Sequence, residues 1–272
     1  KTLGSLLVAS GITTHPSKIC IVDTESGSAD FYANNKDIKG YQVISLTPPY
    51  SPQRYCAAIE AAENAGFETI ILDSISHEWD GEGGALEMNA EATKRNKSGN
   101  SFTAWQDTSA EHRKFINAMI GCKAHLIATV RQKADYDTSA GMNGRMSIRK
   151  TGVKVIQREG IEFEFTTVIT LAADHTIIID KDRTGLLEPL QGKVLSKEVG
   201  QELRKYTLGE GVVTPKEIDN REQGRIKNEI NSIKQENELY AYFDALRPDQ
   251  KTSPEIKELF VERRKALKGV AA

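Results

Sequence analysis

Short apolar runs of strand length alternate with helical patterns through the first half of the chain. The apolar runs lie at 19–22, 41–46, 68–73 and 125–130. Apolar residues recur at close to helical spacing over 3–12, 51–66 and 109–121. Strands of this length that alternate with helices build right-handed β–α–β units. The pattern therefore predicts an α/β fold with a mostly parallel sheet that carries helices on both faces.

The second half of the chain has a different pattern. Strand signals at 153–156, 162–171 and 176–180 follow one another with short turns, which favours antiparallel edge strands. Helical patterns then cover 197–207, 215–246 and 253–268. A length of 272 residues allows one to two domains. We therefore predict a core domain over 1–195 and a C-terminal helical region over 196–272.

The composition is that of an ordinary globular protein and excludes several classes. A formal net charge of -2 does not by itself indicate a nucleic-acid binder. No apolar run approaches the ~20 residues that cross a bilayer, so we expect no membrane partner. Cys20, Cys56 and Cys122 are far apart, which argues against a disulfide framework and fits a reducing compartment. We therefore expect a cytoplasmic location.

Polar side chains gather at the predicted carboxyl ends of three strands. In an open parallel sheet, ligands bind beyond these ends. The side chains are Asp23, Glu25, Asp73, Ser74, Thr129 and Arg131. Two strands that present carboxylates at one edge, beside a helix that opens with Lys-Thr, indicate a site for phosphate and magnesium.

Lys1 and Thr2 stand where the Lys-[Ser/Thr] pair of G-x-x-x-x-G-K-[ST] stands, at the first turn of a helix. In that motif backbone N–H groups hold the phosphates, the lysine meets the terminal ones, and the hydroxyl takes a magnesium position. Because the chain starts at Lys1 without a methionine, we expect the first strand and the glycines of the motif to precede it. Taken without the rest of the sequence, Lys1 and Thr2 have an alternative interpretation, which is a chance dipeptide at a frayed terminus.

The run 70–73 is an apolar strand that ends in one carboxylate, as a Walker B strand does. A helix-capping aspartate after a buried strand is the alternative. The chain also contains Ile-Val-Asp-Thr-Glu at 21–25, Ile-Ala-Thr-Val-Arg at 127–131 and Lys-Asp-Arg-Thr-Gly at 181–185. In this order the motifs resemble the RecA-like P-loop ATPase core. With Ser-His-Glu-Trp at 76–79, they look most similar to phage-encoded single-strand-annealing or recombinase ATPases of the AAA-domain family.

The resemblance covers roughly residues 1–190 and implies ATP and Mg²⁺ as ligands, with hydrolysis to ADP and phosphate. It implies that Lys1 and Thr2 bind the phosphates and that Thr2 and Asp73 hold Mg²⁺. Glu25 matches the glutamate that polarises the attacking water, and Ser74 matches the small polar residue after the Walker B aspartate.

Three further positions carry implied roles. Thr129 falls where the bacterial recombinase has a glutamine that senses the γ-phosphate, which departs from the family pattern. Lys181 and Arg183 resemble the cationic pair that related recombinases insert into the ATP site of the neighbouring subunit. An arginine finger supplied in this way makes hydrolysis depend on assembly. The alternative interpretation of residues 181–183 is a solvated turn between strands, with no role in the neighbouring ATP site.

The segment 131–150 corresponds to the loop that holds single-stranded DNA in the RecA family. Its candidate contacts are Arg131, Lys133, Tyr136, Arg145, Arg149 and Lys150. Basic side chains neutralise phosphates and release counterions, and Tyr136 is a candidate to stack on a base. A flexible surface loop with scattered charges is the alternative, and the net charge of -2 favours it.

The leading hypothesis is an ATPase that assembles into a homo-oligomer, ring or filament, and acts on single-stranded DNA during annealing or strand exchange. The second is a nucleotide-switched loader or scaffold with little hydrolysis, docked to a single-strand-binding or replication protein. A P-loop kinase of a small substrate is a weaker third, because Glu25 and 181–183 fit it less well. If the chain is phage-encoded, its expected location is the cytoplasm of the bacterial host.

Overall fold

A computed structural model describes the backbone of residues 1–95, 101–140, 146–209, 215–246, 250–251 and 253–269. It describes the side chains of these residues except 101–103, 136–140, 146–151, 215–223 and 268–269. The chain divides into two compact units, Lys1–Gly211 and Val212–Ala272. Each unit contains its own cluster of buried apolar side chains.

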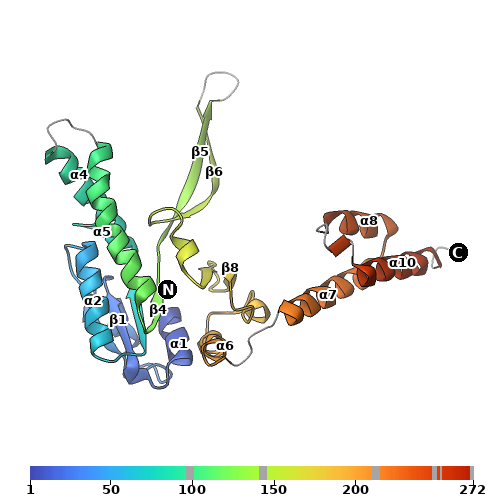
Figure 1. Cartoon of the computed structure of the whole chain (residues 1–272), viewed down its shortest axis with the longest axis horizontal. Coiled ribbons are helices and arrows are strands. Elements are labelled where there is room, and N and C mark those ends of the chain that lie inside the picture. The colour runs from blue at the N-terminus through green and yellow to red at the C-terminus, as the bar shows by residue number, and fades with distance from the viewer. Residues whose placement is uncertain (96–100, 141–145, 210–214, 247–249, 252, 270–272) are drawn as a thin grey trace. The chain divides into compact units, whose positions relative to one another are not determined.

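The first unit is built on a parallel four-stranded sheet in the order β2-β1-β3-β4 (Figure 1). The strands are β1 (Ile19–Asp23), β2 (Gln42–Ser45), β3 (Thr69–Asp73) and β4 (His125–Ala128). Asp23 lies opposite Asp73 in the register of β1 and β3, so both strands end at the same edge. The predicted α/β class and parallel sheet are confirmed.

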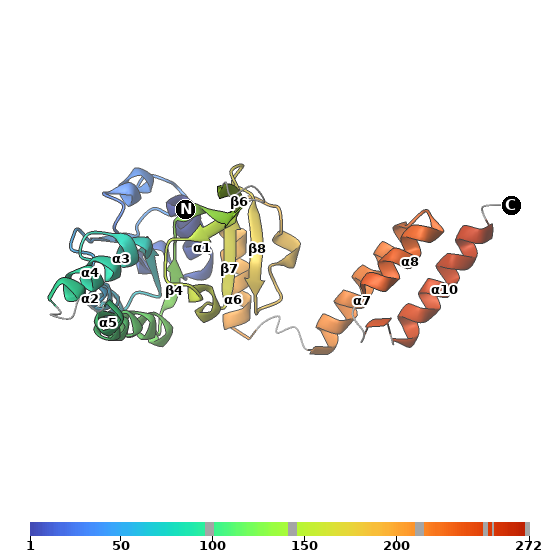
Figure 2. The ribbon, with the colours of Figure 1, turned by 90° about the horizontal axis from the view of Figure 1, so that it is seen from above.

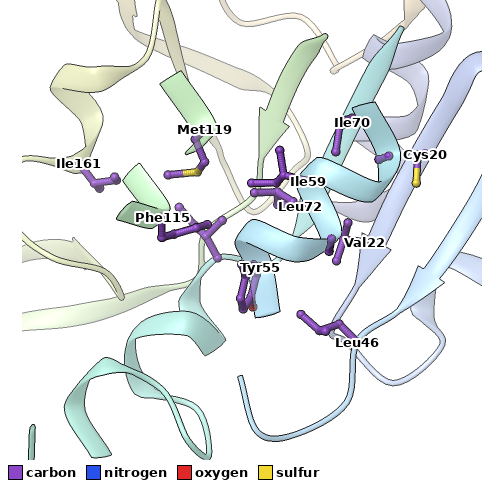
Figure 3. Close-up of a cluster of buried hydrophobic side chains, with 13 residues drawn as sticks. Cys20, Val22, Leu46, Tyr55, Ile59, Ile70, Leu72, Phe115, Met119 and Ile161 are labelled. Atoms are coloured by element: carbon purple, nitrogen blue, oxygen red, sulfur yellow. The ribbon is translucent and has the colours of Figure 1, made fainter. Parts of the chain in front are cut away.

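Helices cover both faces of this sheet because successive strand residues point to opposite sides. The helices are α1 (Thr2–Ile12), α2 (Pro52–Asn64) and α5 (Ser101–Gly121). A cluster between the sheet and α2 and α5 contains Cys20, Val22, Ile70, Leu72, Tyr55, Ile59, Phe115 and Met119 (Figure 3). The cluster on the α1 face contains Leu6, Ala9, Ile19, Ile21 and Ile71. The alternation along β1 and β3 therefore fixes which helix lies on which face.

Short helical elements fill the connections. They are α3 (Ser76–Asp80), α4 (Ala85–Arg95) and the 3-10 turns η1 (Pro16–Lys18), η2 (Ser28–Tyr32), η3 (Ile161–Glu164) and η4 (Glu188–Leu190). The polar stretch predicted over 76–103 thus contains two helices and the beginning of α5.

The strands after β4 differ from the prediction. The segment predicted as a loop over 131–150 forms most of an antiparallel hairpin of β5 (Gln132–Ala140) and β6 (Met146–Val155). Two further strands, β7 (Thr167–Leu171) and β8 (Ile177–Asp182), pair with each other. Neither pair joins the edge of the parallel sheet, so the prediction of antiparallel edge strands is wrong in this detail. In both pairs the strands hydrogen-bond to each other instead of to β2 or β4.

Helix α6 (Lys197–Thr207) packs directly on α1. A Cβ added to Gly200 would lie 2.0 Å from the carbonyl oxygen of Val8, and one added to Gly11 would lie 2.2 Å from that of Lys197. Glycine at both positions lets the two backbones touch. Val8 and Val199 join Ile177 in an apolar cluster with β8, and Figure 2 shows α6 beside β7 and β8. The first unit therefore extends past the predicted boundary at 195 and includes α6.

In the part of the second unit that the structure describes lie the helices α7 (Pro215–Ser232), α8 (Glu236–Ala245) and α10 (Pro254–Gly269). Its buried core is formed by Ile226, Ile230, Leu239 and Ile256. The single helix predicted over 215–246 is two helices, because residues 233–235 interrupt it. Across the part of the chain that the structure describes, none of the helices is long and apolar enough to cross a membrane.

Candidate functional site

The first turn of α1 and the end of β3 meet through a short side-chain network. The hydroxyl of Thr2 donates to Oδ2 of Asp73 at 2.5 Å. The hydroxyl of Thr129, which directly follows β4, donates to Oδ1 of the same carboxylate. The Asp73 side chain is completely buried. Three residues predicted as ligand-binding from separate segments are thus in direct contact at one edge of the sheet.

Glu25 lies at the same edge, two residues beyond the end of β1. Arg131 donates from Nε to Oε1 of Glu25 at 2.9 Å and from Nη2 to Oε2. The Nζ atom of Lys1 lies 3.6 Å from Oε1. Burial alone raises the pKa of the Glu25 carboxyl, but the hydrogen bond from Arg131 and the charges of Lys1 and Arg131 outweigh it. The result is a pKa lowered to about 2, so Glu25 is ionised at neutral pH.

Asp23, the other carboxylate of this edge, has a structural role. Its Oδ1 accepts the backbone N–H of Glu25 at 2.6 Å, and its Oδ2 accepts that of Ala29 at 3.0 Å. Both bonds hold the turn after β1 in place. Asp23 therefore positions the backbone of Glu25, which leaves the Glu25 carboxylate for other contacts.

Thr24 links β1 to the turn after Asp73. Its hydroxyl accepts the backbone N–H of Ser74 at 2.8 Å and lies 2.8 Å from Nδ1 of His77. The His77 ring stacks on Tyr50 with 4.8 Å between ring centroids. Burial lowers the pKa of His77, and the nearby Arg131 charge lowers it further. Neutral His77 is therefore favoured beside Glu25.

The residues predicted to bind nucleic acid do not share one environment. Arg131 turns toward the sheet edge and pairs with Glu25, whereas Lys133 is exposed on β5. Arg145 lies outside the described residues. The side chains of Tyr136, Arg149 and Lys150 also lie outside them, although their backbone positions belong to the hairpin.

Lys181 and Arg183 lie at the end of β8, close to η3. Lys181 donates to the carbonyl oxygens of Glu162 at 3.1 Å and Phe163 at 2.8 Å. Arg183 donates to the same oxygen of Phe163 at 3.3 Å. Within the described residues, their hydrogen bonds connect neither cation to Glu25 or Asp73. The prediction that this pair enters the ATP site of a neighbouring subunit stays a prediction.

A buried polar cluster beneath α3 was not predicted. Glu78, fully buried, lies 3.0 Å from Nδ1 of His112 and accepts a hydrogen bond from Nε2 of Gln157 at 3.1 Å. The same Gln157 amide donates to the carbonyl oxygen of Ile75 at 2.9 Å. These residues are 34 and 79 positions apart in the sequence, so no local pattern relates them. Glu78 lies in the polar segment Ser-His-Glu-Trp-Asp, so the sequence carries no signal that this carboxylate is buried and needs a buried partner.

The donor set at the sheet edge fits magnesium bound with a nucleotide. Mg²⁺ takes oxygen ligands, usually one or two from the protein with the rest from water and phosphate. Thr2 and Asp73 provide a hydroxyl and a carboxylate in contact. The buried hydroxyl oxygen of Ser74 has no hydrogen-bond partner among the described residues. No group of three His, Cys, Asp or Glu side chains suited to a metal occurs in that part of the chain, so an all-protein metal cage is not what these residues form.

Two surface hollows lie at the opposite edge of the sheet. The smaller is lined in part by Ser10 and Lys197, and the larger by Glu63 and His125. Thr14 and Arg204 line both of them. Because these residues come from the start of β4, the C-terminal ends of α1 and α2 and both ends of α6, the hollows are separate from the Asp73 edge.

Comparison with known proteins supports the assignment of the fold. A protein-family model described as an AAA domain matches residues 7–195. This span contains the sheet, Glu25, Asp73, Thr129 and the hairpin. Searches of curated proteins and of solved structures found no match. Since the family model covers more than half of the sequence, the chain belongs to the AAA domain family of P-loop ATPases.

Proposed function

We propose that this protein is a RecA-like ATPase of the phage recombination type, which binds ATP with Mg²⁺ and acts on single-stranded DNA. Membership of the AAA domain family supports nucleotide binding and ATPase activity in general. The observation that carries the proposal is the contact of Thr2 with Asp73, with Lys1 3.6 Å from Glu25 at the same edge. Phosphoryl transfer is catalysed mainly by positioning and by charge stabilisation, and these residues are suited to both.

Each residue of the edge has a chemical role in this proposal. The Lys1 ammonium binds the terminal phosphate, at the positive N-terminus of α1. The Thr2 hydroxyl and the Asp73 carboxylate hold Mg²⁺, and Thr129 fixes the orientation of Asp73. Bound Mg²⁺ neutralises charge on the phosphate oxygens. The Glu25 carboxylate accepts a hydrogen bond from the attacking water and orients it toward the phosphorus atom.

Glu25→Gln tests this assignment in the full-length protein. The variant should retain ATP binding and lose turnover, because an amide keeps the size of the side chain but cannot accept the proton of the water. Glu68→Gln is the matched control, since Glu68 binds Thr14 at the amino end of β3. Steady-state hydrolysis and binding of a non-hydrolysable ATP analogue are measured for both. Unchanged hydrolysis in Glu25→Gln would remove the assigned role.

Assembly is the second part of the proposal. Arg183 is exposed, and among the residues that the structure describes its guanidinium donates through Nη2 to the main-chain oxygen of Phe163, which leaves its other guanidinium donors available to a neighbouring copy. Arg183→Ala should lower the specific activity of assembled protein by at least tenfold, and leave the low rate of highly diluted protein unchanged. An equal loss at both concentrations would show that Arg183 does not act between subunits.

A nucleotide-switched loader is the second candidate function. The separate second unit, with its own core of Ile226, Ile230, Leu239 and Ile256, supports it, because a small helical unit is suited to docking a partner protein. Steady-state ATP hydrolysis with and without single-stranded DNA separates the two candidates. A negligible rate in both conditions, with ATP binding retained, would favour the loader.

A further inference from the structure

His77 is held in a fixed position near the nucleotide edge, although the roles assigned above do not include it. It belongs to α3, in the turn that follows Asp73. Its ring nitrogen Nδ1 lies 2.8 Å from the hydroxyl oxygen of Thr24. Its ring stacks on Tyr50 with 19° between the ring planes, and the Tyr50 hydroxyl donates to the carbonyl oxygen of Thr24 at 3.4 Å. The hydrogen bond and the stack together fix the ring, and with it the second ring nitrogen, Nε2.

The hydroxyl of Thr24 determines which nitrogen of His77 carries the proton. A hydroxyl has one hydrogen to donate and two lone pairs with which to accept. One lone pair accepts the backbone N–H of Ser74 at 2.8 Å. The hydrogen is donated to the carbonyl oxygens of Asp73 at 3.1 Å and Ser74 at 3.3 Å. The second lone pair then accepts a hydrogen from Nδ1, so all hydrogen-bonding positions of the hydroxyl are used when Nδ1 of His77 is protonated.

A neutral ring that is protonated on Nδ1 has a lone pair on Nε2. Burial lowers the pKa of His77 below its ordinary value of 6.5, and the charge of Arg131 lowers it further, so the ring is neutral at pH 7. Among the residues that the structure describes, Nε2 has no hydrogen-bond partner, and the ring is only partly buried. His77 therefore presents a hydrogen-bond acceptor that is not yet engaged.

The charged groups that act on this ring are mainly those of the nucleotide edge. Two of them favour the protonated ring and two oppose it. The favourable pair is Glu25, after β1, and Asp80 of α3, whereas the opposing pair is Arg131, after β4, and Lys1, before α1. His77 is thus in electrostatic contact with Lys1 and Glu25, the residues assigned to the terminal phosphate and the attacking water.

Hydrolysis of ATP releases a proton that Glu25 is not suited to keep. The pKa of the Glu25 carboxyl is about 2. The carboxylate can accept a hydrogen bond from water and orient it, but at neutral pH it does not retain the proton. An efficient proton acceptor has a pKa closer to the pH at which the enzyme works. The imidazole of His77 meets this requirement, because its pKa lies below 6.5 but far above that of Glu25.

We propose that His77 is a catalytic residue that accepts, on Nε2, the proton of the water that Glu25 orients. This inference rests on the proposed ATPase function and adds a second residue to its chemistry. The water oxygen forms a bond to the γ-phosphorus, and the bond between the γ-phosphorus and the bridging oxygen breaks, with its electron pair left on ADP. The proton of the water goes to the Nε2 lone pair and then to solvent, which the partly exposed ring reaches.

The first experiment measures the tautomer of His77 in the wild type. The ring nitrogens of full-length protein labelled with ¹⁵N-histidine are recorded by NMR at neutral pH, and the signals of His77 are assigned through its backbone. We expect a proton on Nδ1 and none on Nε2. A proton on Nε2 would overturn the proposal, because no lone pair would then be available. This measurement needs no substitution, so it decides the question even if variants of His77 fold poorly.

The second experiment removes Nε2 and keeps the contact with Thr24. In His77→Asn the side-chain amide takes the place of Nδ1, and nothing replaces Nε2. The full-length variant should bind a non-hydrolysable ATP analogue as the wild type does. It should hydrolyse ATP about 100-fold more slowly, the lower end of what general acid–base catalysis contributes. An unchanged rate would overturn the proposal.

The matched control is His175→Asn. His175 is exposed in the turn between β7 and β8, and its φ of 68° is one that asparagine adopts readily. This variant should hydrolyse ATP at the wild-type rate.

The dependence of kcat on pH separates a proton acceptor from a structural residue. In the wild type kcat should fall as the pH drops through the pKa of His77, below 6.5, because a protonated ring cannot accept a proton. Glu25 stays ionised over this range, and the ionisation of ATP is the same for both proteins. The remaining activity of His77→Asn should lack this fall. If the fall persists in the variant, His77 only supports the structure of the edge and the proposal is overturned.

The outcomes distinguish this inference from the proposed function. A wild-type protein that does not hydrolyse ATP overturns both. A wild-type protein that hydrolyses ATP, with a proton on Nε2 of His77 or with the same pH profile in His77→Asn, overturns the role of His77 alone.

Discussion

Gly200→Ala tests the packing of α6 on α1, the helix that carries Lys1 and Thr2. The added Cβ would lie 2.0 Å from the carbonyl oxygen of Val8, whereas ordinary contact begins at 3.4 Å. The helices must therefore separate by about 1.4 Å, and the neighbouring atoms are backbone, which cannot rotate away. Overpacking of this kind costs about 1–3 kcal/mol. In a unit of this size the cost corresponds to a melting temperature lower by about 2–12 °C.

The assay for Gly200→Ala is thermal unfolding followed by tryptophan fluorescence. The two tryptophans, Trp79 and Trp105, both belong to the first unit and stack on each other with 5.9 Å between ring centroids. Their signal therefore reports the unfolding of this unit. Gly121→Ala, at the end of α5, is the control, because an added Cβ meets no atom within 4 Å. Equal melting temperatures for the two variants would show that α6 does not pack on α1 at Gly200.

Two further predictions concern the carboxylates of the edge. Thr129→Val removes one of the two hydroxyl donors to buried Asp73. It should lower the free energy of unfolding, measured by urea titration, by about 1–3 kcal/mol. An unchanged urea midpoint would contradict the hydrogen bond from Thr129 to Asp73. The pKa of Glu25 falls from an ordinary 4.5 to about 2 on folding, so its ion pair stabilises the protein above pH 4.5 and loses this effect as the pH falls toward 2. Because the carboxylate is only partly buried, we expect Glu25→Gln to cost about 1 kcal/mol at pH 7 and less at pH 3, and an equal cost at both would contradict the pairing.

The parallel sheet and its ligand edge could be predicted because both depend on local patterns. The apolar runs at 19–22 and 68–73 are short, β-branched and followed by carboxylates, so they identify strands and their ends. Parallel pairing then brings Asp23 and Asp73 to one edge. The contact of Thr2 with Asp73 followed from the same topology, since α1 begins at that edge.

The hairpin and α6 could not be predicted in the same way. The sequence of β5, Gln-Lys-Ala-Asp-Tyr-Asp-Thr-Ser-Ala, has no β-branched aliphatic residue to indicate a strand, and its strand structure depends on pairing with β6. The close approach of α6 to α1 depends on Gly11 and Gly200, whose small size leaves no periodic signal. The sequence places Arg131 at the sheet edge, but its pairing with Glu25 joins residues 106 apart, and only the three-dimensional structure reveals this pairing.

The account as a whole depends on Asp73 and Thr2 forming one magnesium and nucleotide site at the edge of the sheet. The most direct measurement is the affinity of full-length protein for a non-hydrolysable ATP analogue, with and without Mg²⁺, in the wild type, in Asp73→Asn and in the exposed control Asp30→Asn. We predict that Mg²⁺ strengthens binding in the wild type and the control, and that Asp73→Asn loses about tenfold or more of this enhancement. An enhancement that is unchanged in Asp73→Asn would contradict the assignment of this edge as the nucleotide site.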